Sequence, residues 1–187
     1  MTPKPCILIH YHEISLKGHN RSWFEKILKK NIRSQIKPLP FSNVENNAAR
    51  LFIFGIDVDQ WNKYAIKLQK VMGLMNAHLM FRINPNIEDI KQLAAELVKK
   101  ERFNSFRIST KRQYKNFPLT SQDLNKEIGT YLQSLYNKPV ILKGADLDLK
   151  IELVNGKAYM GISKIQGYGG LPVGTGERAI SLISSGI

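Results

Sequence analysis

Regular alternation of apolar and charged residues near the end of the chain constrains the fold most. Between residues 146 and 154, Leu and Ile alternate with charged residues. This period of two predicts a strand with one buried face. Asn155-Gly156 follows directly and predicts a tight hairpin turn, with a return strand over about 157–163. A β-sheet with an antiparallel pair is therefore part of the fold.

Apolar residues spaced by three and four predict helices elsewhere. One begins where Ser22 and Glu25 form a capping-box pattern, and another begins at a similar pattern of Thr120 and Asp123. Two more are expected over about 59–72, with Gly73 as the C-cap, and over 87–101. Short apolar runs predict further strands over 6–11, 50–56, 77–83 and 105–111.

Helices and strands follow each other without strict alternation, which indicates an α+β fold. We expect two small domains that meet somewhere within residues 56–76. Five of the ten residues from 167 to 176 are glycine, and this stretch is interpreted as a linker. A buried strand is expected over 179–183, and the small residues Ser184-Ser185-Gly186 after it are typical of a phosphate loop.

The positive charge is large and uneven. The 187 residues include 28 Lys and Arg against 15 Asp and Glu, a net charge of +13, which favours a polyanionic partner. Two windows, 17–37 and 97–117, hold 14 of these basic residues and only 2 of the acidic ones. The second window also carries aromatic residues, which stack on unpaired bases in RNA-binding proteins.

Simpler explanations cover part of this charge. A solvated helix face accounts equally well for four basic residues of the first window: Lys26, Lys29, Lys30 and Arg33. Phe103 and Phe106 flank a strand, and we expect them in the core. The loop 111–117 lies between a strand and a helix, where binding residues concentrate, and it is the stronger candidate for ligand contact.

Other sites and compartments are less well supported. No apolar run approaches the ~18 residues of a membrane span, so we expect no membrane partner. The single cysteine, Cys6, excludes an internal disulfide and favours the cytoplasm. It opens an apolar strand and is expected in the core rather than in catalysis. His10, His12 and Glu13 lack further ligands, so no metal site is predicted.

Several motifs, in order along the chain, resemble the bacterial tRNA 4-thiouridine synthetase (ThiI) family. The segment 106–112 (FRISTKR), with 115–118 (KNFP) and 121–129, is similar to the central signature of a THUMP domain. The other similar segments are 13–18 (EISLKG), 169–175 (GGLPVGT) and 182–187 (LISSGI), which resemble the start of a ferredoxin-like domain, a linker and the opening of a PP-loop.

The resemblance implies a ferredoxin-like domain over 1–60, an α/β THUMP domain over 61–166, a linker over 167–178 and the start of a truncated PP-loop domain over 179–187. It implies that the first two domains grip the acceptor stem and CCA end of tRNA. The family's PP-loop domain adenylates uridine 8 with ATP and magnesium, and a cysteine desulfurase supplies sulfur. Some members also serve thiamine synthesis, and a homodimer is left open.

The resemblance also implies roles for individual residues. The RNA-binding set is Lys17, Arg21, Arg107, Lys111, Arg112, Lys115, Asn116 and Phe117, with Asn116 and Phe117 placed at the terminal bases. The nucleotide-binding set, which would act only in a longer protein, is Leu182, Ile183, Ser184, Ser185 and Gly186. Ser185 departs from the family's usual glycine.

We expect no catalytic residue and no bound cofactor in this chain, which would bind RNA without thiolating it. One alternative is an RNA-binding subunit that acts in trans with a separate PP-loop protein. Another is the THUMP region of a different RNA-modifying enzyme, against which the PP-loop opening argues.

Overall fold

The computed structural model describes residues 2–177 and confirms an α+β fold. Over that range the α-helices are α1 (Arg21–Ile36), α2 (Trp61–Gln69), α3 (Ile87–Val98) and α4 (Ser121–Tyr136). The strands are β1 (Lys4–His10), β2 (Asn43–Asn47), β3 (Arg50–Phe54), β4 (Asn76–Ile83), β5 (Phe106–Arg112), β6 (Leu147–Val154), β7 (Lys157–Gly161) and β8 (Lys164–Gln166). Short 3-10 turns cover Glu13–Leu16, Gly18–Asn20 and Val58–Gln60.

Within residues 2–177 the strands form one sheet, in the order β2-β3-β1-β4-β7-β6-β5, with β8 paired to β4. The β5–β6 pair is parallel, and the other pairs are antiparallel. The succession β1-α1-β2-β3-α2-β4 is the ferredoxin-like arrangement. Strand β4 continues this sheet into the second half, because residues 81–83 also pair with β7.

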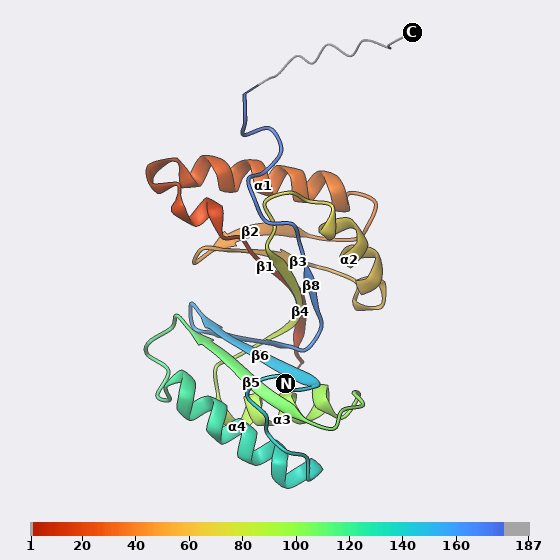
Figure 1. Ribbon diagram of the computed structural model, residues 1–187, viewed down its shortest axis with the longest axis vertical. Helices are drawn as coiled ribbons and strands as arrows, with labels where there is room; N and C mark the ends of the chain where they lie inside the picture. Colours follow the sequence, from red (N-terminus) through yellow and green to blue (C-terminus); the bar gives the residue numbers. More distant parts are fainter. Residues whose placement is uncertain (1, 178–187) are drawn as a thin grey trace.

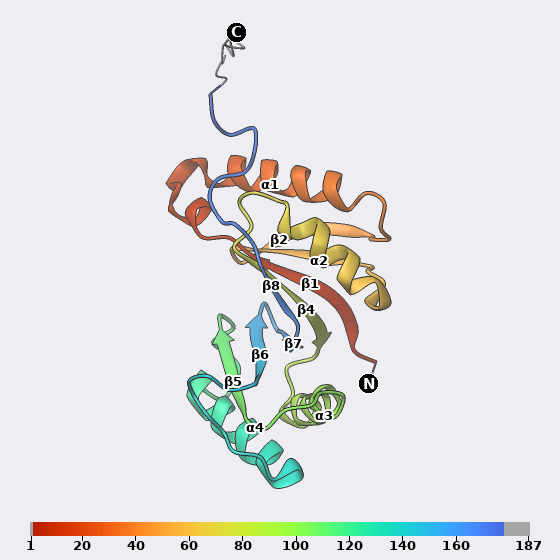
Figure 2. The same cartoon turned by 45° about the vertical axis from the view of Figure 1, so that its right-hand side comes forward.

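Helices cover only one face of each half. Helices α1 and α2 lie on the sheet of the first half, and α3 and α4 lie at the opposite end of the molecule on β5, β6 and β7 (Figures 1 and 2). The sheet faces without helices are turned toward each other in the middle. There a small apolar cluster joins the halves: Cys6, Leu8, Phe52, Met80, Val154 and Tyr159. Cys6 is fully buried in this cluster, as expected, and burial raises the pKa of its thiol to about 12.

The capping box predicted at Ser22 and Glu25 is wrong. Two 3-10 turns run directly into α1, and the Arg21 N–H donates to Gly18 O. The cap residue, Asn20, makes no side-chain cap. Glu25 is buried instead, and its carboxylate accepts hydrogen bonds from Tyr11, Arg21 and Asn46. By contrast, Thr120 and Asp123 form the predicted capping box at the start of α4.

The hairpin of β2 and β3 had no clear signal in the sequence. Its turn is made by Ala48 (φ 51°) and Ala49 (φ 62°), left-handed conformations that cost an alanine about 1–2 kcal/mol. The second half contacts this turn, because Gln113 Nε2 donates to Ala48 O at 3.2 Å. The same oxygen accepts a hydrogen bond from Arg50 Nη1 of β3 at 2.8 Å. The predicted turn at Asn155-Gly156 is confirmed, with positive φ at both residues.

The division between the halves lies beyond residue 60. Tyr64 and Leu68 of α2 belong to the core of the first half, which extends to Leu79. The expected boundary at 60/61 therefore falls inside the first half. Helix α2 also ends at Gln69, so Gly73 is not its C-cap.

The segment expected to be a linker is docked on the first half. The Gly167 and Gly169 N–H groups donate to Met75 O and Leu74 O, both at 2.9 Å, and the Gly73 N–H donates to Gly169 O at 2.7 Å. Pro172 is buried. A Cβ on Gly73 would meet it at 3.0 Å, and Gly73 has a φ of +96°. Over 167–173 the chain is thus part of the first half.

No helix within residues 2–177 has the length and apolar character needed to cross a membrane.

A substitution at Gly161 of β7 tests the close contact between β7 and β4 at the junction of the two halves. A Cβ there would lie 2.0 Å from Leu79 O, a backbone atom of β4 that cannot easily move. We predict that Gly161→Ala lowers the free energy of unfolding by about 2–4 kcal/mol. Gly129→Ala is the matched control, because the nearest atom is 3.9 Å away and the position is helical, so this variant is neutral or slightly stabilising. Urea denaturation measures both, and equal stability of the two variants would contradict the assigned contact.

Candidate nucleic-acid interface

The helix-free face of β5 and β6 carries polar residues because side chains alternate between the two faces along each strand. Leu147, Leu149, Ile151 and Leu153 face the helices of the second half. The residues between them must face the other way, which places Asp148, Lys150 and Glu152 on the face turned toward the first half. On β5 the residues opposite these three are Arg107, Ser109 and Lys111.

A buried ionic cluster joins this face to the first half. Glu152 is fully buried, and its Oε2 accepts a hydrogen bond from Arg50 Nε of β3 at 2.5 Å. Its Oε1 lies 2.8 Å from His10 Nε2 of β1. The other ring nitrogen of His10 lies 2.7 Å from Asn76 Oδ1, which is also 3.0 Å from His78 Nε2. The Glu152 carboxylate therefore connects β6 to β3 and β1.

The electrostatics of this cluster keep Glu152 ionised. Burial alone would raise its pKa, but the contact with His10 and the charges of His10, Arg50 and Lys150 outweigh it and hold the pKa at about 2. Burial, followed by the positive charge of Lys150, lowers the pKa of His78 to about 3. His78 is thus neutral near pH 7.

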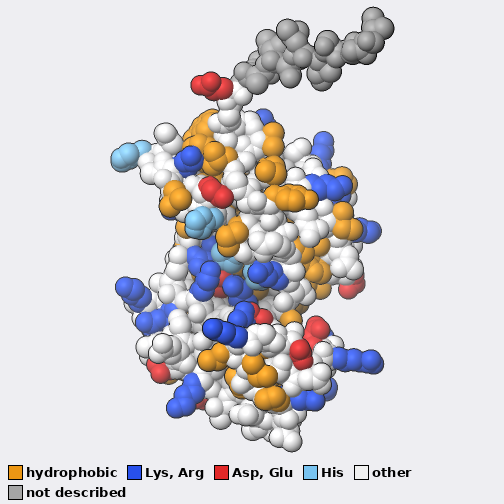
Figure 3. Space-filling model, viewed as in Figure 1, with side chains coloured by type: hydrophobic (Ala, Val, Ile, Leu, Met, Phe, Trp, Pro, Cys, Tyr) orange, Lys and Arg blue, Asp and Glu red, His pale blue; other side chains and the backbone are white. Residues whose placement is uncertain are grey.

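Three lysines surround the cluster where it reaches the surface, and we call them the waist lysines: Lys111, Lys150 and Lys164. Lys164 is on β8 directly opposite His78, so the two side chains share a face. The pKa of Lys150 is lowered, first by burial and then by the charges of Lys111 and Lys164, which Glu152 and Asp148 oppose. Figure 3 shows Lys and Arg side chains gathered across the middle of the molecule. Like charges held this close favour an incoming anion.

The structure brings two of the predicted RNA-binding residues to this face. Lys111 is exposed on β5. Arg107 is half-exposed, forms an ion pair with Asp148, and donates to Leu142 O at 3.2 Å. Lys115 and Asn116 are exposed in the loop that follows β5.

Two other predicted residues have structural roles. Phe117 is buried at 4% exposure in the core of the second half, so its ring cannot stack on a base, and that assignment is wrong. Arg112 Nη1 donates to Phe117 O and Leu119 O, both at 3.0 Å. Its guanidinium therefore holds the loop that presents Lys115 and Asn116.

Lys17 and Arg21 lie in the first half at the start of α1. Lys17 Nζ is 5.3 Å from the centre of the Phe24 ring. Arg21 Nε donates to Glu25 at 2.6 Å, and Arg21 is about one-third exposed. Neither contacts the waist lysines. The predicted nucleotide-binding residues 182–186 lie outside the described residues.

Two family models match the chain in succession. The ThiI ferredoxin-like domain matches residues 6–77, and the THUMP domain matches residues 84–163. The chain is the ferredoxin-like and THUMP region of the ThiI family. The matches meet near residue 80, where β4 passes from the first half to the second.

Individual proteins and solved structures are similar to most of this chain. A protein of Thermus thermophilus named "Probable tRNA sulfurtransferase" is 32% identical over 95% of this chain and 43% of its own length. A Pyrococcus horikoshii crystal structure (TM-score 0.83, 30% identity) covers 91% of this chain and 58% of that one. The structure of a 4-thiouridine synthetase–RNA complex with bound ATP (TM-score 0.76, 26% identity) covers 92% and 44%. The chain spans less than half the length of the curated relatives it matches.

Sequence reasoning missed Lys150 and Lys164 because both lie outside the two basic windows. A signal for Lys150 was present: it alternates with leucines that face the core, so it had to lie on the opposite face. Lys164 had no such signal, since its position depends on the pairing of β8 with the distant strand β4.

His78 gives the cluster a pH dependence. Its pKa is about 3 in the folded protein and about 6.5 when unfolded. The unfolded state therefore binds more protons below pH 6.5, and folding stability falls as the pH is lowered. We predict a loss of about 2 kcal/mol from this residue between pH 7 and pH 5. His78→Gln removes that component, whereas His19→Gln, at an exposed position, does not.

Urea unfolding at the two pH values measures this difference. An equal pH dependence in the wild type and in His78→Gln would show that folding does not lower the pKa of His78.

Proposed function

We propose that this chain is the tRNA-binding portion of a tRNA sulfurtransferase, a 4-thiouridine synthetase. The observation that carries the proposal is the set of waist lysines on the face between the two halves. Both ThiI-family domains contribute to it. Lys111 and Lys150 come from the THUMP domain, and Lys164 lies on β8, which pairs with β4 beside β1 of the ferredoxin-like domain.

The arrangement suits the phosphate backbone of RNA. Lysines bind phosphates as point charges without reading base identity. Each neutralised phosphate releases condensed counterions, so the affinity depends steeply on salt. The buried contact of Glu152 with Arg50 and His10 holds the two halves in one orientation, so the lysines need not be ordered when RNA binds.

The exposed loop that carries Lys115 and Asn116 lies directly after β5, the strand of Lys111. We propose that the waist lysines hold the acceptor stem and that this loop reaches its CCA end. In the longer protein, a PP-loop domain would then adenylate uridine 8 with ATP, with sulfur supplied through a cysteine desulfurase. Action in trans with a separate PP-loop protein would use the same tRNA-binding face.

A gel-shift titration of deacylated tRNA at several salt concentrations tests the waist. We predict that Lys111→Gln/Lys164→Gln weakens binding about tenfold or more and reduces the slope of log K against log salt by about two. Both lysines are exposed, so the fold is not at risk. Lys63→Gln/Lys70→Gln removes the same charge from exposed positions on and beside α2 and is the matched control.

Two controls decide how the gel-shift result is interpreted. Equal weakening by both double variants would mean that the chain attracts RNA through its net charge alone, which contradicts a site at the waist. Removal of the CCA end from the tRNA tests the loop that carries Lys115 and Asn116, because equal affinity for tRNA with and without the CCA end would refute its proposed role.

A further inference from the structure

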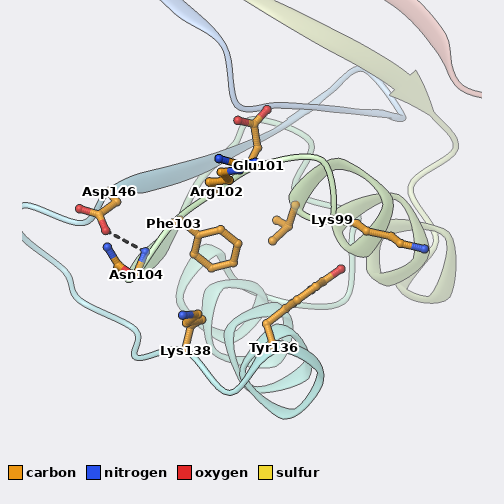
Figure 4. A pocket seen from close by; sticks show the side chains of 9 residues that line it. Lys99, Glu101, Arg102, Phe103, Asn104, Tyr136, Lys138 and Asp146 are labelled. Carbon is orange, nitrogen blue, oxygen red and sulfur yellow. Dashed lines mark hydrogen bonds between the residues drawn. The ribbon is translucent and has the colours of Figure 1, made fainter.

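A second candidate site lies at the far end of the THUMP domain, away from the waist. A pocket of about 530 Å³ opens where the C-terminal ends of α3 and α4 meet the segment that leads into β5. This volume is within the range of small-molecule sites. Its lining includes Phe103, Tyr136, Arg102, Lys138 and Asn104 (Figure 4).

Two aromatic rings form the apolar part of the pocket. Phe103 is only partly buried, although it lies beside a core that fully buries its neighbour Phe106. Its ring is 6.1 Å from that of Tyr136 at an angle of 69°, and 6.0 Å from that of Phe106 at 83°. Neither neighbour lies flat over Phe103, which leaves a ring face for a planar ligand. The Tyr136 hydroxyl donates to Ala95 O at 2.9 Å and fixes its ring.

Cations flank this aromatic corner. In Figure 4, Arg102 and Lys138 lie on either side of Phe103, whereas Lys99 and the carboxylate of Glu101, which also line the pocket, point away from its ring. Within residues 2–177 neither Arg102 nor Lys138 is paired with a carboxylate. The nearby Asp146 is engaged instead, because its Oδ2 accepts the N–H groups of Asn104 and Ser105 at 2.9 and 3.2 Å.

The location of Lys138 has a partial explanation in the fold. It follows the C-terminus of α4, where the helix dipole favours a cation. The dipole does not account for Arg102, nor for an incompletely buried phenylalanine between the two charges. The side-chain amide of Asn104 is exposed as well, and it makes no hydrogen bond within the described residues. The combination is a flat apolar surface, a group that can donate to and accept from a base edge, and two cations.

We propose that this pocket binds a nucleotide, with the base stacked on Phe103 and the phosphate held by Arg102 and Lys138. Stacking on an aromatic ring beside cations is how proteins hold unpaired nucleotides. The same chemistry is offered by an unpaired nucleotide of an RNA strand and by a free nucleoside monophosphate. The proposal does not depend on the waist lysines, which belong to a different face.

The test uses the fluorescent base 2-aminopurine, which is quenched when it stacks. The 187-residue chain is titrated into 2-aminopurine riboside 5′-monophosphate, and separately into a single-stranded RNA pentamer with this base at its centre. We predict saturable quenching that weakens about tenfold in Phe103→Leu, which keeps apolar bulk but removes the ring. Lys138→Gln should weaken binding about threefold through loss of a phosphate contact. Lys70→Gln, at an exposed lysine beside α2, should leave it unchanged.

The outcomes distinguish an RNA strand from a free nucleotide as the ligand. Tighter binding of the pentamer than of the monophosphate identifies an RNA strand as the ligand, and equal affinities identify a free nucleotide. Absence of quenching with both probes overturns the proposal, as does quenching that is the same in Phe103→Leu and the wild type. Lys138→Gln changes only a side chain at the pocket rim, so it keeps the test valid if Phe103→Leu fails to fold. Loss of tRNA binding in the waist variants would leave this result unaffected.

Discussion

The buried contact of Glu152 with Arg50 and His10 determines how the two domains are oriented. Glu152 belongs to the THUMP domain, and its two partners belong to the ferredoxin-like domain. A buried ion pair adds little net stability, since the cost of desolvation offsets the attraction. Its effect appears when the partners separate, because an unpaired buried charge costs about 3–5 kcal/mol. Any rotation between the domains therefore carries a large penalty.

The path of the chain reinforces this orientation. Strand β4 pairs with β1 along most of its length and with β7 at its end, so one strand belongs to both domains. After β7 the chain returns through β8 and docks along 167–173 on the ferredoxin-like domain. The THUMP domain is thus tied to its neighbour where the chain enters it and where the chain leaves it. The spacing of the waist lysines on the face between the domains is therefore already set by the fold.

Much of the fold could be predicted from local patterns. The capping box at Thr120 and the turn at Asn155-Gly156 are short-range features, and both are present as predicted. The strand β2 was missed because its turn, Ala48-Ala49, lacks the Asn or Gly that normally marks a hairpin. The capping box predicted at Ser22 failed for another reason: Glu25 is bound by Tyr11 and Asn46, which are distant in sequence. Tertiary contacts determine the structure at both positions, and such contacts cannot be inferred from local sequence patterns.

The candidate site was harder to predict than the fold, because charge density along the chain does not show which face of the sheet a residue occupies. The basic residues of α1 lie on a helix that packs on the opposite face of the sheet from the waist. Lys150 reaches the waist through the alternation of β6, which places its neighbours Leu149 and Ile151 in the core. A shift of one residue in the pairing of β6 would exchange these positions and bury the lysine. The apolar residues that hold β6 in register therefore also determine where the positive charge of the waist appears.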